Sequence, residues 1–175
     1  GFYLNQHKEL HDVLLEREAA NKKTLLIGVS FALLDFAESF PCQVPSTIVM
    51  ETGGMKGRRK ELLREELHTI LKQRLGVDQI HSEYGMTELL SQAYAPKNGV
   101  FFAPPWMRVL VRNPHDPFDL KQNGKGCLNI IDLANRNSCA FIATDDLGEV
   151  HADGSFEVLG RFDAADVRGC NLMVS

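Results

Sequence analysis

The stretch Ser46-Thr47-Ile48-Val49-Met50-Glu51, with the glycine pair Gly53-Gly54 and the segment 60–75 behind it, decides the fold of this chain. The first stretch is a short apolar run typical of a buried parallel strand. The segment 60–75 is predicted to be a helix that ends at Gly76, because its apolar residues recur at helical spacing. These residues are Leu62, Leu63, Leu67, Ile70, Leu71 and Leu75. A strand, a glycine loop and a helix in this order predict a crossover unit of a parallel sheet.

The same alternation extends on both sides of this unit. We predict a helix over 4–23, a strand over 24–30, a second helix that stops before Pro41, and a strand that ends near His81. Beyond Pro96 short strands replace the alternation. We expect them at 107–111, 126–131, 140–143 and 148–159, the last with Asp153-Gly154 as a hairpin turn. The fold class is therefore α/β, with a partly parallel sheet and crossover helices over 1–95 and a β-rich subdomain over 96–175.

Composition limits the kind of partner. The chain has 175 residues, 44% of them hydrophobic, which suffices for a real core. A net charge of -4, from 19 basic and 23 acidic residues, disfavours general binding to nucleic acid. The apolar runs are far shorter than the roughly 20 residues that cross a bilayer. The polar segment 5–10 lacks the apolar core of a signal peptide, so we expect a cytoplasmic protein.

Cysteine and histidine spacing gives no metal motif. The four cysteines, Cys42, Cys127, Cys139 and Cys170, form no C-x-x-C pair, so we expect free thiols. His7 and His11 have the helical spacing of a zinc protease motif, but Lys8 stands where that motif needs its glutamate. A solvated helix face is the better interpretation.

The motif Ser82-Glu83-Tyr84-Gly85-Met86-Thr87-Glu88 follows a predicted strand, at the end of a parallel sheet where such sheets bind ligands. Its residue types suit a nucleotide: a ring that stacks on a base, a hydroxyl for a phosphate oxygen and a carboxylate for Mg²⁺. A structural alternative makes Thr87 the cap of a helix, with Glu88 in the first turn. Gly53-Gly54 has a similar pair of interpretations, a close approach to a ligand or a turn that needs positive φ.

Two further motifs lie near the end of the chain. Thr144-Asp145-Asp146-Leu147-Gly148 offers a carboxylate that can accept hydrogen bonds from two hydroxyls, although an acidic turn between strands is an ordinary alternative. Gly160-Arg161-Phe162-Asp163 follows it and adds a guanidinium group. These two motifs follow the tyrosine motif along the chain, and we interpret the three together because of this order and spacing.

Together the motifs resemble those of the adenylate-forming enzymes, which activate a carboxylic acid as its acyl-AMP. The resemblance implies that Gly53, Gly54 and Gly85 line the nucleotide pocket and that the Tyr84 ring stacks on adenine. It further implies that Thr87 contacts the α-phosphate and that Glu88 binds magnesium. Asp146 would accept hydrogen bonds from the two ribose hydroxyls, although Asp145 stands where the family's motif usually has a glycine. Arg161 would contact ribose or phosphate, and Asp163 would be the pivot of a hinge.

The segments 104–109 and 165–173 are similar to a narrower group, the acyl-protein synthetases of the bacterial luminescence operon (LuxE). In that group a cysteine near the C-terminus accepts the acyl group, and Cys170 matches it. Arg168 favours a thiolate at Cys170, whereas Asp166 opposes it, and a buried inert cysteine is the alternative. The resemblance covers about 46–173.

The resemblance implies a ligase that uses ATP and Mg²⁺ to activate a fatty acid, transfers the acyl group to Cys170 and delivers it to an acyl reductase. Two alternatives stay open: an acyl-CoA ligase, and a non-catalytic fragment that binds a nucleotide or a partner. Nothing before Ser46 resembles the family's phosphate loop. We therefore expect the C-terminal half of such an enzyme, inactive as a fragment.

Overall fold

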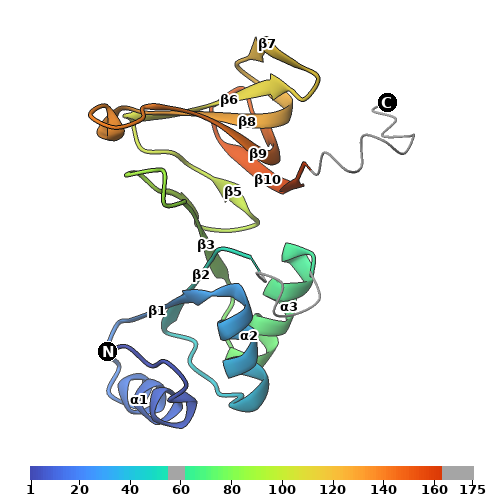
Figure 1. The fold of residues 1–175 in the computed structure, drawn as a ribbon. Helices are drawn as coiled ribbons and strands as arrows, with labels where there is room; N and C mark the ends of the chain where they lie inside the picture. Colours follow the sequence, from blue (N-terminus) through green and yellow to red (C-terminus); the bar gives the residue numbers. More distant parts are fainter. Residues whose placement is uncertain (55–61, 163–175) are drawn as a thin grey trace. The chain divides into compact units, whose positions relative to one another are not determined.

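The computed structural model describes residues 1–54 and 62–162, and the chain divides into two compact units. Unit 1 comprises Gly1–Gly85 and Tyr94–Gly99, and unit 2 comprises Met86–Ala93 and the chain from Val100 onward. Figure 1 shows the elements of both units in chain order. The expected boundary after residue 95 stays a prediction.

Unit 1 is built on a parallel sheet with crossover helices. Its elements are α1 (His7–Ala19), β1 (Thr24–Val29), α2 (Ser30–Ser39), β2 (Thr47–Thr52), α3 (Arg64–Leu75) and β3 (Ile80–Tyr84), with β4 (Ala93–Ala95) next to β3 in the sheet. Strand β2 pairs in parallel with both β1 and β3. The parallel sheet and the crossover helices predicted from the sequence are confirmed.

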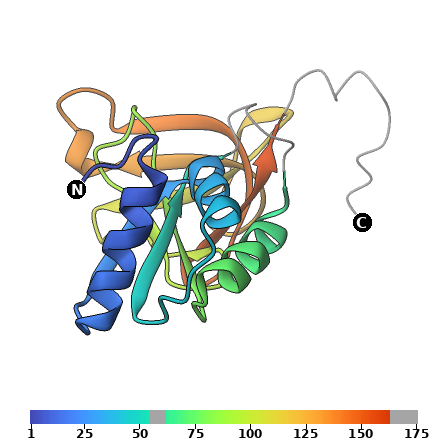
Figure 2. The same cartoon turned by 90° about the horizontal axis from the view of Figure 1, so that it is seen from below.

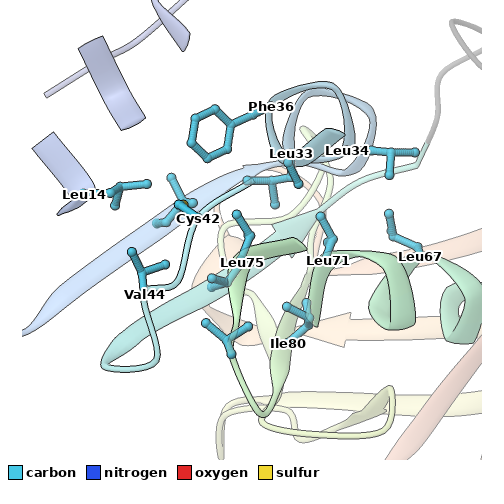
Figure 3. Packing of buried hydrophobic residues seen from close by; sticks show 14 residues of the cluster. Leu14, Leu33, Leu34, Phe36, Cys42, Val44, Leu67, Leu71, Leu75 and Ile80 are labelled. Carbon is cyan, nitrogen blue, oxygen red and sulfur yellow. The ribbon is translucent and has the colours of Figure 1, made fainter. Parts of the chain in front are cut away.

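The core of unit 1 lies between the three helices and one face of the sheet (Figure 2). Leu26 and Val49 point into it, whereas Leu25 and Ile48, their neighbours along the strands, are 57% and 49% exposed. Figure 3 shows how side chains from all three helices meet the sheet. The fully or nearly fully buried members include Leu14, Leu33, Leu34, Phe36, Leu71, Leu75 and Ile80.

Helix α3 begins later than the apolar pattern predicted. Leu63 has extended backbone angles and is 71% exposed, so it precedes the helix instead of packing under it. Its N–H donates to the Glu66 carboxylate at 3.2 Å, an interaction that marks a helix start. The predicted end is confirmed, because Gly76 adopts the left-handed conformation with φ of 64°.

Unit 2 is an antiparallel sheet in the order β5-β10-β9-β8-β6-β7. Its strands are β5 (Val100–Phe101), β6 (Met107–Asn113), β7 (Asp116–Lys121), β8 (Gly124–Asp132), β9 (Phe141–Val150) and β10 (Phe156–Arg161), and the short helix η1 (Leu133–Asn135) follows β8. The β9–β10 hairpin turns at Asp153-Gly154 as predicted, and the Asp153 side chain accepts from Ser155 N at 3.0 Å. No helix within 1–54 and 62–162 is long and apolar enough to cross a bilayer.

Candidate functional site

The residues predicted to bind the nucleotide fall into two sets, one in each unit. Unit 1 carries Gly53, Gly54, Tyr84 and Gly85, and unit 2 carries Thr87, Glu88, Asp146 and Arg161. Cys170 and Asp163 lie outside the described residues. Each set is built by its own unit.

Gly53 and Gly54 follow β2, and their backbone conformations differ. Gly53 has a φ of 69°, so the turn itself requires a glycine there. Gly54 does not have a positive φ, and no described atom lies within 4 Å of where its Cβ would stand. The turn therefore explains Gly53, whereas neither a positive φ nor a contact with a described atom requires glycine at position 54.

A buried polar network lies behind this glycine loop. Glu51 is only 4% exposed, and its Oε2 accepts a hydrogen bond from Ser30 Oγ at 2.8 Å. The same hydroxyl contacts the carbonyl oxygen of Gly53. Arg64 Nε and His68 Nε2 stand 3.6 and 3.7 Å from Glu51 Oε1. The network thereby joins the ends of β1 and β2 to α3 and fixes the start of the glycine loop.

Burial alone would raise the pKa of Glu51. Hydrogen bonds from His68, Ser82 and Ser30, together with the charge of Arg64, outweigh this effect and lower the pKa of Glu51. The group is not a catalytic triad, because Ser82 Oγ and Glu51 both approach the same nitrogen, Nε2, of His68. Its chemistry is that of a structural network around an ionised carboxylate.

Tyr84 ends β3, and its side chain is buried. The preceding residue, Glu83, accepts a hydrogen bond from Thr52 Oγ1 at 3.2 Å. Burial, together with the charge and a hydrogen bond of Glu83, raises the pKa of Tyr94 on β4. The tyrosine motif is thus tied to the strands on both sides of β3, and exposed Gly85 follows directly.

Thr87 and Glu88 lie in a turn, so the helix-cap alternative is wrong. Leu89 N donates to Met86 O at 3.1 Å, and the chain then continues without helix. Both Thr87 and Glu88 are exposed, whereas Leu89 is buried. The next two N–H groups bond to a side chain instead of continuing a helix, and this side chain is Asp132.

Asp132 ends β8 and is fully buried. Its Oδ2 accepts from Leu90 N and Ser91 N, each at 2.9 Å, and its Oδ1 accepts from Ser91 Oγ at 2.7 Å and Ala134 N at 3.1 Å. Burial opposes ionisation, but these hydrogen bonds prevail and lower the pKa of Asp132. Asn135 adds a bond from its amide nitrogen to Glu88 O at 2.8 Å.

The motif at 144–146 forms a bulge inside β9, so the acidic-turn alternative is also wrong. Cys127 pairs with Leu147 and Asn129 pairs with Ala143, so three residues of β9 face Leu128 alone. Thr144 Oγ1 donates to Leu128 O at 2.8 Å and accepts from Asp146 N at 3.1 Å. The threonine hydroxyl therefore bridges the base of the bulge.

Arg112 and Arg161 surround this bulge. Arg112 Nη2 donates to Thr144 O at 2.9 Å, while its Nε donates to Asn129 at 3.0 Å. On the other side of β9, Arg161 of β10 stands opposite Asp146 in the register of the two antiparallel strands. The fold therefore brings the carboxylate and the guanidinium of two separate motifs onto neighbouring strands, and the Arg161 side chain is exposed.

Among the described side chains, no three of His, Cys, Asp and Glu come together in a group that would hold a metal ion by itself. Glu88 nevertheless fits Mg²⁺, because this ion usually takes one or two carboxylates and fills its shell with phosphate oxygens and water. Glu88 is an exposed carboxylate on a turn whose carbonyl oxygen accepts from Asn135, and it would supply one such ligand.

No family model and no curated protein matches the chain. Several solved structures, however, match it. ATP-bound MatB from Rhodopseudomonas palustris matches with a TM-score of 0.64 and 18% identity, over 89% of this chain and 33% of that one. Coronafacic acid ligase from Pectobacterium brasiliense matches with a TM-score of 0.61 and 15% identity, over 88% and 32%. Over most of its length the chain therefore has the fold of one part of each of these two proteins.

A third neighbour, the luciferase-like enzyme from the nonluminescent mealworm Zophobas morio, has a TM-score of 0.56 and 20% identity over 86% of this chain and 41% of that one. At such identities the likeness establishes the fold, and the fold class expected from the sequence is confirmed. The chain spans about a third of the length of MatB and of coronafacic acid ligase.

Proposed function

We propose that this chain is the nucleotide-binding part of an ATP-dependent ligase that activates a carboxylic acid as its acyl-AMP. The pairing of Asp146 with Arg161 at the β9 bulge carries the proposal. A carboxylate suits the two hydroxyls of a ribose, and a guanidinium suits the phosphate beside it. Two motifs that are separate in the sequence thus supply complementary groups at one place.

Other observations support a nucleotide. Among the described residues, no atom lies within 4 Å of where a Cβ on Gly54 would stand, so they leave room for a ligand beside the main chain there. Thr87 and Glu88 are exposed on a turn that buried hydrogen bonds hold. One solved neighbour is an ATP-bound protein and another is named an acid ligase.

In the proposed reaction, a carboxylate oxygen of the substrate forms a bond to the α-phosphorus of ATP, and pyrophosphate leaves. Thr87 donates a hydrogen bond to the α-phosphate, and Arg161 offsets the negative charge that develops there. Glu88 holds Mg²⁺, which when bound neutralises phosphate charge. Asp146 orients the nucleotide at the ribose.

The finer proposal concerns the acyl acceptor. The Cys170 thiolate attacks the carbonyl carbon of a fatty acyl-AMP, a thioester forms and AMP leaves, and an acyl reductase receives the acyl group. Intact-mass spectrometry of the protein at its full natural length, after incubation with fatty acid and MgATP, tests this step. An acyl adduct supports it, whereas an acyl-CoA product formed only when CoA is added supports a CoA ligase.

Calorimetric titration of the chain with ATP tests the nucleotide site itself. Asp146→Asn should weaken binding more than the matched control Asp145→Asn, because Asp145 is exposed and is not the residue opposite Arg161. A larger loss in Asp145→Asn would place the ribose contact one residue earlier. Absence of ATP binding in the wild-type chain would refute the nucleotide site.

A further inference from the structure

The segment 104–109, which resembles the acyl-protein synthetases, has no role in the proposed chemistry. The structure connects it to the turn at 86–91. Trp106 Nε1 donates to Ser91 Oγ at 2.9 Å, and Ser91 Oγ in turn donates to Asp132 Oδ1 at 2.7 Å. Trp106 O also accepts from Leu133 N at 3.0 Å, which ties the tryptophan to the residue after Asp132.

Asp132 is not itself available to a ligand. A carboxylate has about four acceptor positions, and Asp132 uses four: Leu90 N, Ser91 N, Ser91 Oγ and Ala134 N. It is also fully buried. A metal ion or a substrate hydroxyl would have to displace one of these donors, so the role of Asp132 is to fix the backbone that it holds.

That backbone carries Thr87 and Glu88. Asp132 fixes it at Leu90 and Ser91, directly after the Met86–Leu89 turn, and Asn135 fixes the carbonyl oxygen of Glu88. Leu89 packs inward between these two attachments. The turn therefore has few ways to move while its two exposed side chains stay accessible.

We infer that Asp132 is a positioning residue for Thr87 and Glu88, and that Ser91 links this anchor to Trp106. The inference rests on the proposed function insofar as it concerns ATP. Trp106 is the single tryptophan of the chain and is 53% exposed, so its fluorescence reports on the anchor without a label. Binding of ATP at the turn should change the emission of Trp106 through Ser91.

The anchor is tested by amide hydrogen exchange without nucleotide. In the wild-type chain the N–H groups of Leu90 and Ser91 should exchange slowly, and in Asp132→Asn both should exchange much faster because an amide turns a donor toward donors. Asp153→Asn is the matched control, since Asp153 also accepts from a serine hydroxyl and N–H but in an exposed turn. Unchanged exchange in Asp132→Asn overturns the inference.

Its consequence for the ligand is tested by ATP titration, read by calorimetry and by fluorescence. Asp132→Asn should weaken ATP binding by roughly tenfold to a hundredfold, the usual cost of losing a residue that orients a ligand group. Ser91→Ala keeps the hydrogen bonds that Asp132 accepts from the main-chain N–H groups of Leu90, Ser91 and Ala134, so it should weaken binding less while uncoupling Trp106 emission from ATP.

If Asp132→Asn does not fold, Ser91→Ala carries the test through the loss of the fluorescence response. Equal ATP affinity in wild type and a folded Asp132→Asn overturns the inference. A wild-type chain that binds no ATP while Leu90 and Ser91 stay protected refutes the proposed function alone.

Discussion

Replacing Thr144 by valine removes one buried hydroxyl and keeps the shape of the side chain. The hydroxyl makes two hydrogen bonds, to Leu128 O at 2.8 Å and from Asp146 N at 3.1 Å. Leu128 is fully buried, so its carbonyl oxygen loses a partner that water does not replace, which costs about 1–3 kcal/mol. Asp146 is only half-buried, so its N–H regains water. We expect a loss of about 2 kcal/mol, or roughly 4–8 °C in Tm for a chain of this size.

Urea unfolding followed by Trp106 fluorescence measures this change, because the single tryptophan lies in unit 2 with the bulge. Thr144→Ser keeps the hydroxyl and should recover most of the stability. Thr87→Val is the matched control within unit 2, since the Thr87 side chain is exposed and its replacement should cost less than about 0.5 kcal/mol. Equal stability of wild type and Thr144→Val would show that Arg112 alone holds the bulge.

Three other predictions concern different parts of the chain. Tyr84→Ala should weaken ATP binding by roughly 1–3 kcal/mol by calorimetry, the scale of one lost aromatic platform, and an unchanged Kd would remove Tyr84 from the adenine site. The folded-state pKa of Glu51 lies below the ordinary value of 4.5. The ionised form of Glu51 therefore stabilises the fold above that pH. This contribution is lost as the pH falls through the lower folded-state pKa. Glu51→Gln should therefore flatten the loss of stability as the pH falls below the ordinary glutamate value of 4.5, in acid titrations followed by circular dichroism, and a profile as steep as that of wild type would contradict this. Cys170→Ser, in the protein at its full natural length, should keep ATP/pyrophosphate exchange and abolish the acyl-enzyme, whereas acylation at the wild-type rate would make Cys170 a packing residue.

Local patterns predicted the parallel half of the fold well. The apolar runs of β1 and β2 and the helical spacing of α3 are properties of neighbouring residues, so the sequence alone carries them. Strand β7 was missed because it is an edge strand with no alternation: its residues are nearly all exposed and it contains Pro117. The segment is a strand because it pairs with β6, and its own sequence pattern does not predict it.

The supports of the candidate site were not predictable in this way. Asp132 bonds to Ser91 across 41 residues of sequence, and nothing around Asp132 distinguishes it from any aspartate that follows a strand. In the sequence Glu51 is only the polar end of an apolar run, and Arg112 is only a charged residue directly after the predicted strand 107–111. The exposed groups proposed to meet the ligand were found from motifs, whereas the buried groups that hold them emerge only from tertiary contacts.

The β9 bulge also bears on how this sheet tolerates insertions and deletions. Because three residues face one, the bulge adds an even number of residues, and the strand returns to the same in-and-out alternation at Leu147 and beyond. Loss of a single residue from 144–146 would leave two residues facing Leu128, which is the count of an ordinary β-bulge. Loss of two would restore a regular ladder. Loss of this two-residue excess would therefore remove the acidic bulge and keep the sheet, so the length of this segment can change while the strand pairing on both sides of it stays the same.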